Sequence, residues 1–158
     1  MKVYDIVIVG KNISAMTAAI YAGMSKTKTL YINCPNEKIE VTGVNNYLGY
    51  EAGTYDAFHE NTYKQLMKFQ VEKIESNVKK IVIEENTARI CIEGEPDVVA
   101  NALILSTEDV YNKIENKKDS SFIFKCGKLL NNCTEMISLA GTGSMAAIDA
   151  RQFIAEKK

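Results

Sequence analysis

The sequence contains no tryptophan, only two prolines, a single histidine and four cysteines in 158 residues. It has no run of about 18 apolar residues, which a membrane-spanning helix requires, and no charged-then-apolar leader before its first strand-like run. Acidic and basic residues nearly balance at a net charge of -1, so there is no bias towards nucleic acid. We therefore expect a cytoplasmic protein with neither a nucleic-acid nor a membrane partner.

The cysteines are too sparse for the disulfide framework of a secreted domain, and none has the C-x-x-C spacing of a dithiol centre or zinc site. Cys126 and Cys133 are the nearest pair in sequence, and a loop could bring them together. In a reducing compartment we expect unpaired, unreactive thiols. His59 has no Ser or Cys partner at a nucleophile spacing, and no metal site is expected.

The first part of the chain predicts a βαβ unit. Tyr4–Val9 is an apolar, β-branched run that ends in Gly10, which is typical of a strand buried on both faces. Ser14 is a candidate cap for an Ala-rich helix that ends near Gly23, and a second strand is expected over Thr29–Asn33. Such an order favours a right-handed crossover and the opening of a nucleotide-binding fold.

The rest of the chain supplies the remaining elements of one α/β domain over residues 1–158. The further elements are a loop over Cys34–Thr54, a helix over Tyr55–Phe69, an antiparallel meander over Val71–Glu75, Val78–Glu84 and Thr87–Ile92, a buried strand over Val98–Thr107, an irregular linker over Glu108–Ser121, a strand over Phe122–Phe124 and a helix over Gly141–Glu156. Helical periodicity predicts apolar faces for two helices. The first consists of Phe58, Tyr63, Leu66, Met67 and Phe69, and the second offers Met145, Ile148, Ala150, Phe153 and Ile154 for burial.

Six segments resemble, in order, those of the FAD-binding domain of thioredoxin reductases and the related alkyl hydroperoxide reductase flavoproteins. The segments are YDIVIVG, AMTAAIYAG, VNNYLGY, KFQVEKIESNVKKI, ALILST and AGTGSMAAIDARQFI. The resemblance covers nearly the whole chain and implies a Rossmann-like FAD/NAD(P)-binding domain, with a central parallel sheet, flanking helices and a small antiparallel β-meander. It also implies FAD as cofactor, and a homodimer or a separate reductase as partner.

The resemblance also shows where this chain differs from the family. Family members insert an NADPH-binding domain, which carries a C-x-x-C pair, between the strand here ending at Thr107 and the strand here starting at Phe122. This chain has only residues 108–121 in that place. We therefore expect neither an NADPH site nor self-contained NADPH-dependent disulfide reduction, and no catalytic residue is assigned.

The dinucleotide-binding turn departs from the pattern G-x-G-x-x-G/A, in which the second glycine lets pyrophosphate approach the backbone at a helix N-terminus. The string GKNISA keeps Gly10 and Ala15 but places Asn12 at the second glycine, with its side chain where phosphate oxygens would lie. Asn33 replaces the acid that would bind ribose hydroxyls, and Lys128 replaces an acid after the last strand. The resemblance implies cofactor-binding positions at Gly10, Asn12, Ile13, Ser14, Ala15, Asn33, Asn46, Thr107, Gly127, Lys128 and Met136.

These departures leave two hypotheses open. In the first, the nucleotide site is degenerate and the chain is a pseudo-enzyme that serves as a regulatory or interaction module. In the second, Lys11, Lys125 and Lys128 line the cleft and hold a different anion, or FAD in an altered manner, in a flavin-dependent oxidoreductase component that takes electrons from a separate partner. Tyr47 and Tyr50 could either stack on a planar ring or hold their loop on the fold.

Overall fold

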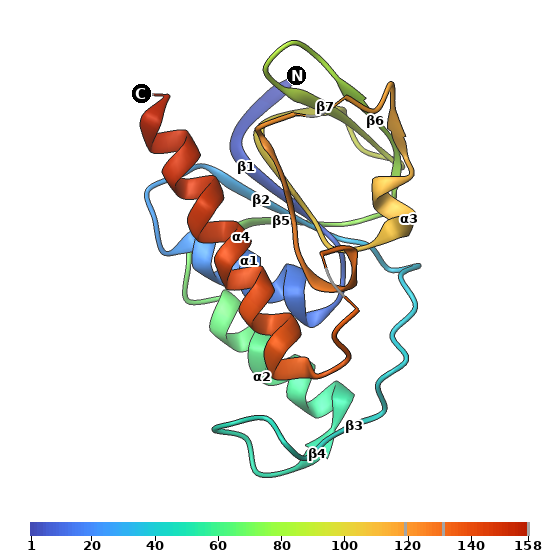
Figure 1. Cartoon of the computed structure of the whole chain (residues 1–158), viewed down its shortest axis with the longest axis vertical. Coiled ribbons are helices and arrows are strands. Elements are labelled where there is room, and N and C mark those ends of the chain that lie inside the picture. Colours follow the sequence, from blue (N-terminus) through green and yellow to red (C-terminus); the bar gives the residue numbers. More distant parts are fainter. Residues whose placement is uncertain (119, 131, 158) are drawn as a thin grey trace.

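The computed structural model describes residues 1–118, 120–130 and 132–157, and in this range it shows a curved mixed sheet with helices packed on one face (Figure 1). The strands are β1 (Lys2–Val9), β2 (Thr29–Asn33), β3 (Gly43–Val44), β4 (Gly53–Thr54), β5 (Glu72–Glu75), β6 (Val78–Ile83), β7 (Ala88–Ile92), β8 (Val98–Leu105), β9 (Ile114–Glu115) and β10 (Ile123–Lys125). The helices are α1 (Ile13–Gly23), α2 (Tyr55–Leu66), α3 (Glu108–Tyr111), α4 (Met136–Glu156) and the 3-10 helix η1 (Gly127–Leu129).

The main sheet has the strand order β5-β2-β1-β8-β7-β6-β9, and β10 also pairs with β8. β1 lies inside the parallel part, because it pairs in parallel with β2 on one side and with β8 on the other. Its side chains alternate between two cores: Ile6 and Ile8 pack with the helices, and Val7 and Val9 pack towards the meander. The predicted doubly buried strands and the mostly parallel sheet are therefore confirmed.

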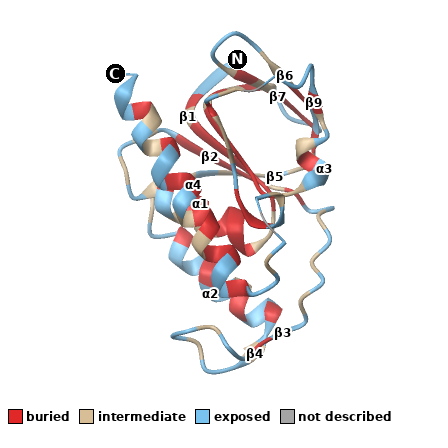
Figure 2. Cartoon of the chain, in the orientation of Figure 1, coloured by how far each residue is buried: buried red, intermediate tan, exposed pale blue. Residues whose placement is uncertain are grey.

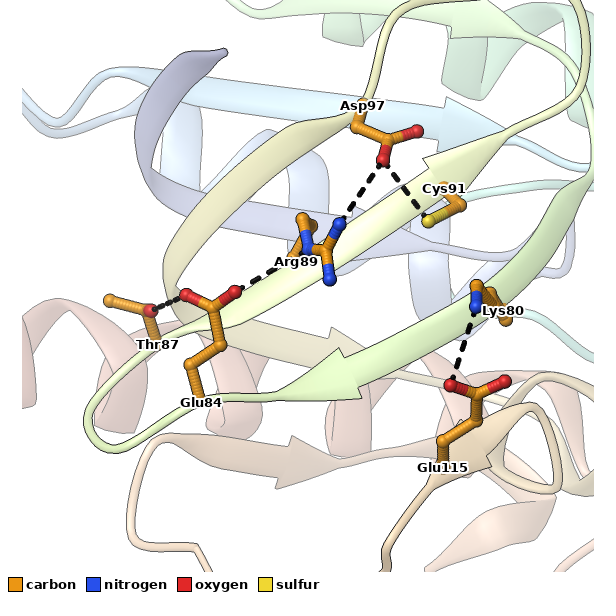
Figure 3. A network of polar contacts seen from close by, with 7 residues as sticks. All are labelled: Lys80, Glu84, Thr87, Arg89, Cys91, Asp97 and Glu115. Carbon is orange, nitrogen blue, oxygen red and sulfur yellow. Dashed lines mark hydrogen bonds and ion pairs between the residues drawn. The ribbon is translucent and has the colours of Figure 1, made fainter.

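The meander differs in part from the prediction. β6, β7 and the start of β8 pair antiparallel as expected, but β5 instead pairs in parallel with β2 at the edge of the sheet. On the meander, the Arg89 guanidinium lies 3.4 Å from Glu84 and 3.9 Å from Asp97, while Lys80 lies 3.5 Å from Glu115 (Figure 3). Because these groups are partly exposed, the ion pairs align neighbouring strands without adding much stability.

The segment expected to be an irregular linker, residues 108–121, contains two regular elements. Thr107 caps α3, since its Oγ1 accepts a hydrogen bond from the Val110 amide at 3.4 Å, and Val110 is buried. β9 then pairs in parallel with β6, with Ile114 opposite Ile81. The prediction of an irregular segment was wrong because a cap and a short strand pairing dock this connection onto the sheet.

Helices α1, α2 and α4 lie side by side on one face of the parallel strands, and their buried residues face the sheet and one another (Figures 1 and 2). α4 begins at Met136 rather than at Gly141, so Gly141 and Gly143 lie inside the helix. A Cβ on Gly143 would lie 2.1 Å from the Ser14 carbonyl oxygen. Glycine at this position therefore allows α4 to pack directly on the first turn of α1.

The predicted helical faces were only partly right. Met145 and Ile148 of α4 are 62% and 48% exposed, and Tyr63 and Met67 are 37% and 60% exposed. Phe58, Leu66, Ala150 and Ile154 are buried as predicted. In α4 the small residues Ala146 and Ala147 are buried as well. Within the described part of the chain, no helix combines the length and apolarity that crossing a bilayer would need.

The close contact between α1 and α4 predicts opposite effects of alanine at two neighbouring glycines. Gly143→Ala should lower the free energy of unfolding by about 1–3 kcal/mol, because the added methyl meets backbone that has little room to shift. Gly141→Ala is the matched control. A Cβ there meets nothing within 4 Å, so it should raise stability by about 0.4–1 kcal/mol. Urea unfolding measures both, and equal effects would contradict the packing described.

Candidate functional site

The candidate site lies where the carboxyl end of β1 meets the first turn of α1, between β2 and β8. In open α/β sheets this switch point is where ligands bind. Gly10 leaves β1 with a φ of 144°, and a Cβ there would lie 2.1 Å from Ser106 Oγ and 3.1 Å from the Ala15 side chain. Gly10 and the fully buried Ala15 thus keep the tight turn of a nucleotide-binding fold.

Asn12, rather than Ser14, caps α1. The Asn12 side-chain carbonyl accepts hydrogen bonds from the amides of Ser14 at 3.0 Å and Ala15 at 3.1 Å. The Asn12 amide group donates to Ser106 Oγ at 2.9 Å. Asn12 therefore uses two backbone donors of the first turn that a phosphate group would otherwise meet.

A residue that the sequence did not reveal, Glu37, occupies the remaining part of this turn. Glu37 lies on the segment after β2 and is half-buried. Its carboxylate accepts hydrogen bonds from the Lys11 amide, the Asn12 amide at 3.2 Å and the Asn12 side chain. Amides at a helix N-terminus, together with the helix dipole, form an anion site. This chain fills that site with its own carboxylate.

The environment of Glu37 is apolar enough to perturb its titration. Burial raises the pKa of Glu37 above its ordinary value of 4.5, and the hydrogen bonds from Lys11 and Asn12 oppose that rise. Burial, followed by the charge of Glu37, raises the pKa of Cys34 to about 11 and that of Cys126 to about 12. Both thiols are protonated at neutral pH and so lack the thiolate that redox exchange requires.

A cavity of about 380 Å³ opens beside Glu37, between the first turns of α1 and α4. It brings together six of the predicted positions: Asn12, Ile13, Ser14, Thr107, Lys128 and Met136. Its remaining charged side chains are Glu37, Lys38, Glu40 and Asp109. Lys128 faces Glu40 across 3.6 Å, so the cation expected to meet a ligand already has an acidic neighbour.

The other predicted positions lie outside this cavity. The Gly127 amide donates to Thr142 Oγ1 at 2.8 Å, and Asn46 donates to Glu135 at 2.9 Å. Asn33 ends β2 with its side-chain oxygen buried and without a hydrogen-bond partner among the described residues.

Two further expectations concern lysines and aromatic rings. Lys11 and Lys125 do not line the cavity, and Lys125 Nζ lies instead 4.5 Å from the centroid of the Tyr111 ring, so the hypothesis of a lysine-lined cleft was wrong for these two residues. The rings of Tyr47 and Tyr50 lie 4.9 and 5.1 Å from that of Phe58. These ring contacts pack the loop of Tyr47 and Tyr50 against α2.

The remaining candidate groups have structural surroundings. Cys126 is fully buried, its thiol lies 3.6 Å from the Leu105 carbonyl, and no disulfide joins it to Cys133. His59 is half-buried, with its ring 5.8 Å from that of Tyr55, and burial lowers its pKa. Within the described ranges, no cluster of three or more His, Cys, Asp or Glu side chains is placed to hold a metal.

These residues do not fit the pyrophosphate of FAD in its usual place. The amides of residues 11, 12, 14 and 15 are all taken by Glu37 or Asn12, and Glu37 adds a negative charge where the phosphates would lie. The signal available in the sequence was an acid shortly after the second strand, near the switch point. Nothing in the local pattern distinguished it from a solvated loop residue.

No family model matches this chain, but it is similar to curated proteins named thioredoxin reductase. The chain is 28% identical over 116 residues to thioredoxin reductase of Bacillus subtilis (strain 168), which covers 72% of this chain and 36% of the relative. It is 26% identical over 160 residues to thioredoxin reductase of Ureaplasma parvum, covering 94% of this chain and 51% of the relative. The chain thus spans about half or less of the length of these relatives.

The crystal structure of a ferredoxin-flavin thioredoxin reductase from Clostridium acetobutylicum resembles this fold with a TM-score of 0.85, over 99% of each chain and at 12% identity. At that identity the likeness shows the fold alone. The sheet order, the turn at Gly10 and the sequence relatives agree with it. The chain is a thioredoxin-reductase-like domain with the Rossmann-type fold of that family's FAD-binding domain.

Proposed function

We propose that this chain acts as an interaction or regulatory module in which the dinucleotide site of a thioredoxin-reductase-like domain is closed by Glu37. One observation carries the proposal: the Glu37 carboxylate is bound to the Lys11 and Asn12 amides at the start of α1. A side chain of the protein therefore takes the position of the cofactor's anion.

Hydrogen-bond energies and charge repulsion favour a site filled by Glu37 alone over one that Glu37 shares with a pyrophosphate. A pyrophosphate that displaced Glu37 would have to break three hydrogen bonds to a charged group, each contributing about 1.5–3 kcal/mol. If Glu37 stayed, two anions would compete for the same donors. That arrangement is unfavourable because the two anions repel each other and because the amides have no donors left for the phosphate.

Self-contained disulfide reduction has little support in this chain. Residues 108–121 connect β8 to β10 through α3 and β9, where the relatives' family carries an additional domain. Cys34 and Cys126 are buried and protonated at neutral pH. The proposed role is therefore association with another protein, either a second copy or a separate reductase.

A second candidate function is a flavin-dependent component that holds FAD in an altered pose and takes electrons from a partner. The cavity of about 380 Å³ beside Glu37 favours it, because six of the expected cofactor-binding positions still meet there. The structural neighbour from Clostridium acetobutylicum is itself named a ferredoxin-flavin enzyme. This candidate expects a yellow protein.

FAD titration separates the two candidates. Bound FAD at 100-fold its Kd would stabilise the fold by about 2.7 kcal/mol, or roughly 5–10 °C in Tm for a chain of this size. We expect the purified wild-type chain to show no flavin absorbance and no rise in Tm with FAD. Glu37→Ala combined with Asn12→Gly should gain measurable FAD binding, since the amides of α1 are released.

The matched control for that titration is Glu40→Ala combined with Asn12→Gly. Glu40 also lines the cavity but does not touch the amides of α1, so this pair should bind FAD less well than the Glu37 pair. Flavin absorbance in the wild-type chain would overturn the closed-site proposal in favour of the flavin component. Equal affinity of the two double variants would show that Glu37 is not the barrier.

The raised pKa of Glu37 also predicts a pH dependence of stability. The folded chain holds the Glu37 proton more tightly than the unfolded chain, so the contribution of this group is fully present below the unfolded pKa and is lost as pH rises through the folded pKa. Urea unfolding across this window should show that the free energy of unfolding of wild type falls, relative to that of Glu37→Gln, as pH rises. A rise of the wild-type value relative to that of Glu37→Gln would mean that the amide hydrogen bonds outweigh burial.

A further inference from the structure

A groove of about 680 Å³ runs over the outer face of the helical layer, and Ile13 lines both this groove and the cavity beside Glu37. α1 forms its floor, α2 and α4 form its walls, and the turn Tyr47–Tyr50 closes one end. From Phe58 to Gln65 and from Ile137 to Ser144, each wall extends about 10 Å, or two helical turns. The groove therefore matches the length of two turns of a third helix.

Three of the apolar side chains that the fold leaves exposed line this groove. Leu48 is 85% exposed, Ile137 43% and Tyr21 36%, and each comes from a different segment. Ile148 continues the exposed apolar line along α4. Exposed apolar surface rimmed by polar residues marks sites of association.

The α4 wall allows close approach of another backbone. Ala140, Gly141 and Ser144 face the groove, and a Cβ on Gly141 would meet nothing within 4 Å. Helices pack at about 8–10 Å between axes, and small side chains favour the shorter end of that range. The wall thus suits a helix that lies along α4.

The charge of the groove selects among apolar partners. Its charged lining residues, within the described part of the chain, are Lys64 of α2 and Lys68 just after the end of that helix, and no acid lines it. Lys64 is 3.5 Å from Glu60 on the solvent side of α2, whereas no ion pair is recorded for Lys68 among the described residues. A partner helix needs an apolar stripe for the floor and carboxylates for this wall.

Resting on the interaction role proposed above, we infer that the α1–α2–α4 groove binds an acidic amphipathic helix of a partner protein. Apolar residues at i, i+4 and i+7 of that helix contact the floor and the Tyr47–Tyr50 turn. Its glutamates or aspartates face Lys64 and Lys68.

The test uses three fluorescein-labelled helical peptides of about 16 residues. One carries the apolar stripe flanked by glutamates, one has lysine at every glutamate, and one has the acidic composition in scrambled order. Fluorescence anisotropy with the full chain should show saturable binding of the acidic peptide, at least about tenfold tighter than the other two. Comparable binding of all three, or binding of none, would overturn the inference.

A charge reversal makes the test specific to the groove. Lys64→Glu with Lys68→Glu should weaken the acidic peptide by at least about tenfold and strengthen the lysine peptide. The control is Lys79→Glu with Lys118→Glu, which changes the net charge equally at exposed sites outside the groove and should leave binding nearly unchanged. Equal losses in both double variants would reduce the effect to net charge and contradict the inference.

Sedimentation velocity and flavin absorbance distinguish two other outcomes, a dimer formed through the groove and FAD binding by the wild-type chain. A dimer of the wild-type chain that dissociates on Ile137→Glu would assign the groove to a second copy and overturn the inference. FAD binding by the wild-type chain would instead overturn the closed dinucleotide site, whatever the peptides do. The peptide readout and the flavin readout can therefore fail separately.

Discussion

The hydrogen-bonding demand of the first turn of α1 governs the rest of this structure. Backbone amides at a helix N-terminus have no partners within the helix and must find acceptors elsewhere. Here Asn12 satisfies those of Ser14 and Ala15, and Glu37 satisfies those of Lys11 and Asn12. The same contacts tie the segment after β2 to the carboxyl edge of the sheet. The cavity of about 380 Å³ lies beside Glu37.

Internal contacts hold the parallel strands and the helical layer together. The parallel strands β1, β2 and β8 pair through buried apolar residues, and α4 packs on α1 through Gly143. The proposed partner site lies on the outer helical face, where Tyr21, Leu48 and Ile137 are exposed.

The sequence predicted the buried strands and the βαβ opening because their signals are local and long. β5 was misassigned and α3 and β9 were missed, because short elements depend on strand partners that are distant in sequence. Asn12 could be identified from the broken glycine pattern, whereas Glu37 meets α1 only through the fold of its loop. Met145 and Ile148 obey helical periodicity, yet small alanines pack more closely on α1 and the sheet and leave these two side chains outside.

The central claim is that the Glu37 carboxylate binds the amides at the start of α1. Proton–nitrogen correlation NMR of the free chain from acidic to neutral pH tests it directly, through the amide resonance of Lys11. The account predicts a low-field Lys11 amide proton that titrates together with the Glu37 carboxyl group and loses this behaviour in Glu37→Gln. A Lys11 amide that responds neither to pH nor to Glu37→Gln would contradict it.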